Sequence, residues 1–248
     1  MLHFPLLASN PFFEAYHHSD LLGKGIFLML IALSIISWSV IIHKLWLTRR
    51  VKKYSEQFRT LFEKHKQQPL HVQYEFSESK EFPHPFFSLY RVLKNHTVEI
   101  LKKNLSFKST KNPTSHEHSY LSPSDIDLIE SHLASTISTQ VTKLESHLYI
   151  LATIVTLAPF LGLLGTVWGI LTTFSELQAH AGGASQLVLG GLSMALATTV
   201  LGLVDAIPAL IGYNYLKNII NDFRSEMENF TNEILASVEF HYRMVEVT

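Results

Sequence analysis

The chain has 248 residues, no cysteine, and 20 lysines and arginines against 21 aspartates and glutamates. These numbers exclude a disulfide-stapled secreted module and a thiolate metal site, and the formal net charge of −1 argues against a nucleic-acid-binding protein. The charged fraction is only 17%, where about 25% is usual. Because the mean hydropathy is also positive, at +0.16, we expect a membrane protein.

Three long segments lack Asp, Glu, Lys and Arg: residues 25–42, 148–175 and 187–204. The third segment resumes after Asp205 and continues without a charge to Leu216. A helix of about 20 apolar residues crosses a bilayer, whereas three such runs are unusual among the buried helices of a short soluble chain. We therefore predict an all-α integral membrane protein with transmembrane helices at 21–42, 148–174 and 187–216.

Basic residues indicate the orientation of the spans. Lys44, Arg49, Arg50, Lys52 and Lys53 follow the first span, whereas residues 1–23 and 175–186 contain no Lys or Arg. Since cytoplasmic flanks collect basic residues, we expect segments 1–20 and 175–186 in the periplasm and segments 43–147 and 217–248 in the cytoplasm. The first apolar run is too long for a signal peptide, so we expect it to be retained.

The cytoplasmic segment 43–147 shows helical patterning. The first helix is expected to continue to about Gln68, a second helix to cover 85–105, and a polar linker to cover 106–120. Ser122, Pro123 and Asp125 have the pattern of a helix start. An apolar stripe then leads into the second span and predicts one continuous helix of about fifty residues. The stripe consists of Ile126, Ile129, Leu133, Ile137, Val141, Leu144 and Leu148.

The C-terminal segment 217–248 also carries an apolar stripe, with alternating steps of four and three residues. Its members are Leu216, Ile220, Phe223, Met227, Phe230 and Ile234. Two interpretations remain open: the helix packs on its own chain, or it joins a cytoplasmic bundle shared between identical subunits.

Small and polar residues line one face of each of the last two spans. In the second span these are Gly162, Gly165, Thr166 and Gly169, and in the third they are Gly191, Ala195, Thr198, Gly202, Asp205, Ala209 and Gly212. Small residues let membrane helices approach closely, so tight packing explains both faces. A pore lining is the alternative, and the residues alone leave both interpretations open.

Two motifs resemble the TolQ/ExbB branch of the MotA/TolQ/ExbB proton-channel family. They are Gly-Leu-Leu-Gly-Thr-Val-Trp-Gly-Ile at 162–170 and Ala-Thr-Thr-Val-Leu-Gly-Leu-Val-Asp-Ala-Ile-Pro-Ala at 197–209, followed by Tyr213-Asn214. The likeness extends more loosely to Ser34–Trp38 and to the three-span topology. The four-span MotA-type stators fit less well.

The resemblance implies a homo-oligomeric ring, thought to be a pentamer, around a single-span TolR/ExbD-type partner whose aspartate carries protons, with a TolA/TonB-type protein as a further partner. Proton entry would then drive work at the outer membrane, since each charge crossing 100 mV supplies about 2.3 kcal/mol. Thr166 and Thr199 match the family's pore-lining threonines, and Thr198 is adjacent. Threonine hydroxyls both donate and accept hydrogen bonds, which suits a proton relay, although a bond to the threonine's own helix is the alternative.

Two positions depart from the family pattern. Many relatives have a glutamate where this chain has Met194, and alanine where it has Asp205. An ionised aspartate in a span costs about 2.5–3.5 kcal/mol, so Asp205 is assigned with the threonines to the proton pathway, with a solvated carboxylate as the alternative. Pro159 and Pro208 belong to the same motifs and are assigned to helix packing with the glycines.

The other signals predict no chemistry. The histidines show no paired spacing of the kind that zinc sites use, so no metal is expected. No nucleotide-binding loop, nucleophile elbow or carboxylate pair is found, so neither a cofactor nor an enzyme is expected. The alternative to a proton channel subunit is a passive membrane scaffold.

Overall fold

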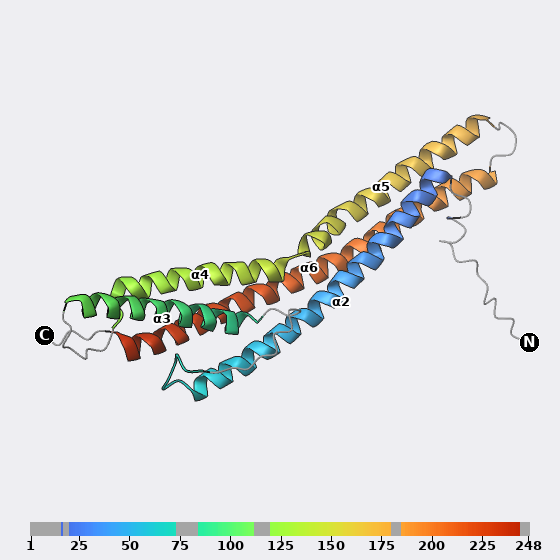
Figure 1. The fold of residues 1–248 in the computed structure, drawn as a ribbon. Coiled ribbons are helices and arrows are strands. Elements are labelled where there is room, and N and C mark those ends of the chain that lie inside the picture. The colour runs from blue at the N-terminus through green and yellow to red at the C-terminus, as the bar shows by residue number, and fades with distance from the viewer. Residues whose placement is uncertain (1–15, 17–19, 73–83, 112–119, 180–184, 244–248) are drawn as a thin grey trace, which may run out of the picture. The chain divides into compact units, whose positions relative to one another are not determined.

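The computed structural model describes Tyr16 and residues 20–72, 84–111, 120–179 and 185–243. These residues form five helices: α2 (Leu21–Lys64), α3 (Pro85–Lys111), α4 (Pro123–Glu145), α5 (Leu148–Ala179) and α6 (Ser185–Tyr242). The described ranges contain no strand, only an isolated bridge between Leu121 and Arg243. Figure 1 shows the helices in chain order, and the predicted all-α class is confirmed.

The helices group into two compact units. Unit 1 contains residues 1–44 and 147–216, and unit 2 contains residues 45–146 and 217–248. Unit 1 includes the three predicted spans, all of which are helical and long enough to cross a membrane. Unit 2 includes the amphipathic segments. Helices α2 and α6 contribute to both units.

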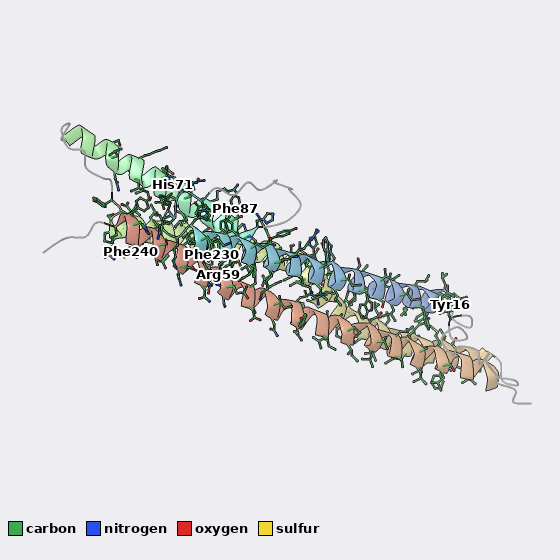
Figure 2. The ribbon with its side chains drawn as sticks, turned by 90° about the horizontal axis from the view of Figure 1, so that it is seen from below. Tyr16, Arg59, His71, Phe87, Phe230 and Phe240 are labelled. Atoms are coloured by element: carbon green, nitrogen blue, oxygen red, sulfur yellow. The ribbon has the colours of Figure 1, made fainter. Side chains whose placement is uncertain are left out.

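Aromatic side chains form the core of unit 2. The rings of Phe86 and Phe230 are stacked with their centroids 4.4 Å apart, and Phe58 and Phe62 contact Phe230 at 6.1 and 5.8 Å. Phe87, labelled with Phe230 in Figure 2, contacts Phe58 with the ring centroids 5.7 Å apart. The side chains of Phe58, Phe62, Phe86 and Phe230 are at most 2% exposed. Large aromatic surfaces removed from water account for the cohesion of this unit.

The two predicted cytoplasmic stripes are buried. The stripe residues of α4 and those of α6 from Leu216 to Ile234 are all below 10% exposure. Phe223 and Phe230 of α6 contact Phe86 of the same chain, so the C-terminal helix packs on its own chain. No second copy is needed to cover this stripe.

The predicted start of α4 is confirmed in detail. The Ser122 hydroxyl accepts a hydrogen bond from the Asp125 backbone amide at 3.2 Å, and the Asp125 carboxylate accepts one from the Ser122 amide at 2.9 Å. Pro123 occupies the first turn. Desolvation opposes ionisation of Asp125, but its bonds to Ser122 and Asn104 outweigh it, so the pKa of the carboxyl lies below its usual value.

The prediction of one continuous helix from Pro123 through the second span is wrong. Helix α4 ends at Glu145, and α5 begins at Leu148. His147 between them adopts a φ of 67°, the left-handed region that non-glycine residues seldom enter. The Ser146 hydroxyl donates to the Lys143 carbonyl at 2.7 Å, which satisfies one of the last carbonyls of α4. An apolar stripe continues across such a break, so periodicity alone does not detect it.

Three other boundaries shift. Helix α3 continues to Lys111, so residues 106–111 of the predicted linker are helical, and residues 112–119 lie outside the described part of the chain. Helix α5 continues to Ala179 and α6 begins at Ser185, so the predicted loop at 175–186 is shorter than expected, and its residues 180–184 are not described. Of the predicted periplasmic segment 1–20, only Tyr16 and Asp20 are described.

Candidate functional site in unit 1

Unit 1 presents a predominantly apolar surface. On α5, Phe160 is 69% exposed and Val167 58%, and on α6, Leu196 is 62% and Ile211 65% exposed. So much exposed apolar surface on three helices of spanning length suits a hydrocarbon environment rather than water.

The helices α5 and α6 touch through glycine. A Cβ atom placed on Gly165 would lie 2.6 Å from Thr198 Cβ, and one on Gly162 would lie 3.0 Å from the backbone of Thr199. Neighbours this close leave no room for a side chain, which explains why glycine occupies both positions. Gly162 and Gly165 thus lie where α5 approaches α6 of the same chain.

The same contact continues in both directions. A Cβ atom on Gly169 would lie 3.0 Å from Ala195 Cβ, and one on Gly202 would lie 2.6 Å from the Ala158 carbonyl oxygen. A Cβ atom on Gly191 would meet the Thr173 hydroxyl. The small stripe of the third span therefore faces α5 of its own chain from Gly191 to Gly202.

Three threonine hydroxyls donate to backbone carbonyls. Thr199 donates to the Gly162 carbonyl at 3.2 Å, and Thr166 donates to the Leu163 carbonyl at 2.7 Å. Thr198 donates to the Ala195 carbonyl of its own helix at 2.9 Å and, over a longer distance of 3.4 Å, to the Gly162 carbonyl. Thr198 is fully buried, whereas Thr166 and Thr199 are partly exposed. Since a hydroxyl that donates to a carbonyl still has acceptor lone pairs, Thr166 and Thr199 remain able to accept a hydrogen bond from outside the chain.

Helix α2 lies against α6. Met194 is 3% exposed and packs with Phe27, and its methyl group blocks any Cβ at Gly23. A thioether thus fills this part of the interface, where a carboxylate would need polar partners. Gly212 of α6 also faces α2. A Cβ atom placed on Gly212 would lie 2.7 Å from Ile41 Cδ1.

Asp205 is buried rather than solvated. Its side chain is 7% exposed, and it accepts a hydrogen bond from the Ser34 hydroxyl of α2. It therefore faces the first span, whereas Thr198 and Thr199 of the same helix face α5. The structure does not bring the four predicted pathway residues to one surface.

The two prolines lie inside helices that continue past them, Pro159 in α5 and Pro208 in α6. A proline has no backbone N–H, so each removes one hydrogen bond from its helix.

A contact that the sequence analysis missed joins α2 to α5. The Asp20 carboxylate accepts a hydrogen bond from the Gly23 amide at 2.9 Å and another from Trp168 Nε1 at 2.7 Å. An aspartate directly before an apolar helix is a recognised capping signal, so the first of these bonds was open to prediction. The second depends on the tertiary structure.

Within the described ranges, no group of three or more His, Cys, Asp and Glu side chains is placed to bind a metal ion.

The fold and these contacts define the chain as an α-helical membrane protein with three closely packed candidate spans. A model of the MotA/TolQ/ExbB proton channel family matches residues 94–229, which include α4, α5 and most of α6. The chain belongs to this family.

Relatives named TolQ and ExbB place it in the TolQ/ExbB branch. The Tol-Pal system protein TolQ of Haemophilus influenzae is 37% identical over 94 residues, which is 38% of this chain and 41% of the relative. The biopolymer transport protein ExbB of Xanthomonas campestris is 32% identical over 108 residues, 44% of this chain and 43% of the relative. That of Aquifex aeolicus is 39% identical over 97 residues, 39% of this chain and 66% of the relative. The first two alignments thus cover about two fifths of the relatives' lengths.

Proposed function

We propose that this chain is a proton-channel subunit of the bacterial inner membrane that forms a homo-oligomeric ring, a pentamer by the family resemblance. In this proposal the ring surrounds a TolR/ExbD-type single-span partner, and a TolA/TonB-type protein carries the work to the outer membrane. The N-terminus lies in the periplasm and the C-terminus in the cytoplasm, in accord with the basic residues after the first span.

One observation carries the proposal. Within the region that matches the family, Thr166 and Thr199 are partly exposed on α5 and α6, and their hydroxyl protons are directed to carbonyls of α5. Each hydroxyl oxygen keeps lone pairs that can accept a hydrogen bond, which suits a protonated carboxyl group of the partner because that group is a hydrogen-bond donor. For proton transfer to water, the carboxyl O–H would exchange the threonine oxygen for a water molecule as its hydrogen-bond acceptor.

The experiment compares Thr166→Val and Thr199→Val with the unaltered chain after reconstitution with the partner. Valine keeps the shape of threonine and removes only the hydroxyl, so each change is expected to abolish partner-dependent proton flux. Thr142→Val is the matched control, because the Thr142 hydroxyl donates to the Ser138 carbonyl of α4 in unit 2. Native mass measurement checks that the ring is still assembled. Normal flux in both variants would contradict the proposal.

A passive membrane scaffold is the second candidate. It is favoured by the finding that Gly162, Gly165 and Gly202 pack within the chain and that every hydroxyl of the three threonines already has a carbonyl acceptor. A scaffold would assemble with its partner and leave a pH gradient intact, so the flux measurement on the unaltered chain separates the two candidates.

A further inference from the structure

Asp205 is the single Asp, Glu, Lys or Arg in the sequence between residues 187 and 216. Its side chain is 7% exposed inside a helix that is otherwise apolar at this level. Placing a carboxylate in a membrane span is costly, and such residues are found where they pair with another group and serve a function. We therefore expect Asp205 to have a function, and the role proposed for the threonines does not include it.

The register of α2 against α6 fixes those surroundings. Gly23 meets Met194 at one end of the contact and Gly212 meets Ile41 at the other, with the same spacing along both helices, so the two helices run parallel in a constant register. Ser34 and Asp205 lie between these contacts at matching positions, and the Ser34 hydroxyl donates to the carboxylate. This pairing agrees with the packing on either side of it.

Among the described residues, the side chains that pack on α6 directly after Asp205 are apolar. Next to it, Ala206 and Ala209 of α6 pack with Ile26 and Leu30 of α2 and with Ala158 of α5 in one apolar cluster. One turn further along α2, Ser37 is 2% exposed. The nearest titratable residue of α2 beyond Ser34 is His43, nine positions or about 14 Å along the helix, while Lys24 and Lys44 each lie ten positions or about 15 Å away. Desolvation lowers the pKa of Lys44, which is 3% exposed, and its charge lies too far away to pair with Asp205.

We propose that Asp205 and Ser34 form a proton-exchange site between the first and third spans of each chain, separate from the threonines that face α5. The carboxylate takes a proton from water to become a carboxylic acid and returns it to water. Ser34 donates to the ionised form and accepts from the acid's O–H, so the bond persists with its donor and acceptor exchanged. The site binds and releases one proton without parting the two helices.

Proton binding is tested on the purified full chain in the absence of any partner, by infrared difference spectra between low and high pH. The unaltered chain is expected to show the C=O stretching band of a buried carboxylic acid. Asp205→Asn should remove this band, and Ser34→Ala should shift it because the acid loses its hydrogen-bond acceptor. Asp127→Asn, which alters an exposed acid of α4, is the matched control and should leave the band unchanged. A spectrum of Asp205→Asn identical to that of the unaltered chain would overturn the proposal.

The inference rests on the proposed function only for its role in transport, and the two fail separately. If the unaltered chain with its partner conducts no protons but the band is present, the proposed function fails and the proton-exchange site stands. If the chain conducts, Asp205→Asn is expected to slow flux several-fold while Thr166→Val abolishes it. Unaltered flux in Asp205→Asn would overturn the part that the site plays in conduction.

Discussion

The two units are held together by opposite kinds of residue. In unit 1 the contact between α5 and α6 depends on glycines that let backbone meet backbone, as where Gly202 approaches the Ala158 carbonyl. In unit 2 the contact between α3 and α6 depends on large rings, as where Phe86 stacks on Phe230. Lipid is as apolar as leucine, so burying side chains drives helices together in water but not in a bilayer. Close approach replaces apolar burial where the solvent is lipid.

The largest effect is expected in unit 1 for Gly165→Leu. Its side chain would occupy the space of Thr198, so α5 and α6 would separate and the α5–α6 contact would be lost. Thermal unfolding of the detergent-purified protein measures the loss. Gly25→Leu is the control, because a Cβ atom there meets nothing within 4 Å. Equal melting of the two variants would remove the basis of the comparison between the units.

In unit 2 the corresponding change is Phe230→Ala. It removes a fully buried ring that contacts Phe58, Phe62 and Phe86, and we expect a loss of about 3–5 kcal/mol in the free energy of unfolding. Denaturant unfolding followed by the near-ultraviolet circular dichroism of the aromatic core gives this value. Phe240→Ala is the control, since Phe240 is 87% exposed (Figure 2) and its removal should cost less than about 0.5 kcal/mol.

Ion pairs between α2 and α6 in unit 2 are expected to matter less. Glu233, 18% exposed, lies 3.3 Å from Arg59 and 3.6 Å from Lys66, so Glu233→Gln should cost about 1 kcal/mol. Glu226 contacts the more exposed Lys52 at 2.6 Å, and Glu226→Gln should cost only a few tenths of a kcal/mol. Both losses should shrink as salt is added. A larger cost for Glu226→Gln would show that exposure does not rank these pairs.

The start of α4 is expected to give a further effect, which depends on pH. The pKa of Asp125 lies below its usual value in the folded protein, so its contribution to stability is complete above the usual carboxyl pKa. The contribution is lost as the pH falls through the lower, folded value. Asp125→Asn should therefore flatten the acid limb of the pH–stability curve, whereas Ser122→Ala should cost about 1 kcal/mol at neutral pH. An acid limb that is unchanged in Asp125→Asn would contradict this assignment.

The sequence was sufficient to predict features that depend on one local physical cause, such as helical spacing or helix capping. The stripes of α4 and α6 have helical spacing and are buried, and Ser122 with Asp125 forms the predicted capping box. It was insufficient to predict the role of a surface whose function depends on which other helix packs against it. The stripe through Gly202 and Thr198 favoured packing and pore lining alike, because no sequence signal says that α5 of the same chain covers it.

The sequence did not predict the helix break at His147, for a different reason. Its left-handed backbone has no glycine or asparagine to announce it, and the apolar stripe of α4 reaches Leu148 without a change of period. The pairing of Ser34 with Asp205 was equally hidden, because it needs the register of two helices that lie far apart in the chain. Local patterns predict helices well and their mutual registers poorly.

The hydrogen bond from Trp168 to Asp20 makes the contact between α2 and α5 accessible to tryptophan fluorescence. The indole N–H of Trp168 donates to a carboxylate, whereas the other two tryptophans, Trp38 and Trp46, are about half exposed. Emission from Trp168 in a chain whose other tryptophans are replaced by phenylalanine would respond to any parting of α2 from α5. The chain has no cysteine, so a single introduced thiol would carry an energy-transfer acceptor to a chosen place. Trp168 is thus an intrinsic fluorescence probe for relative motion of the first and second spans.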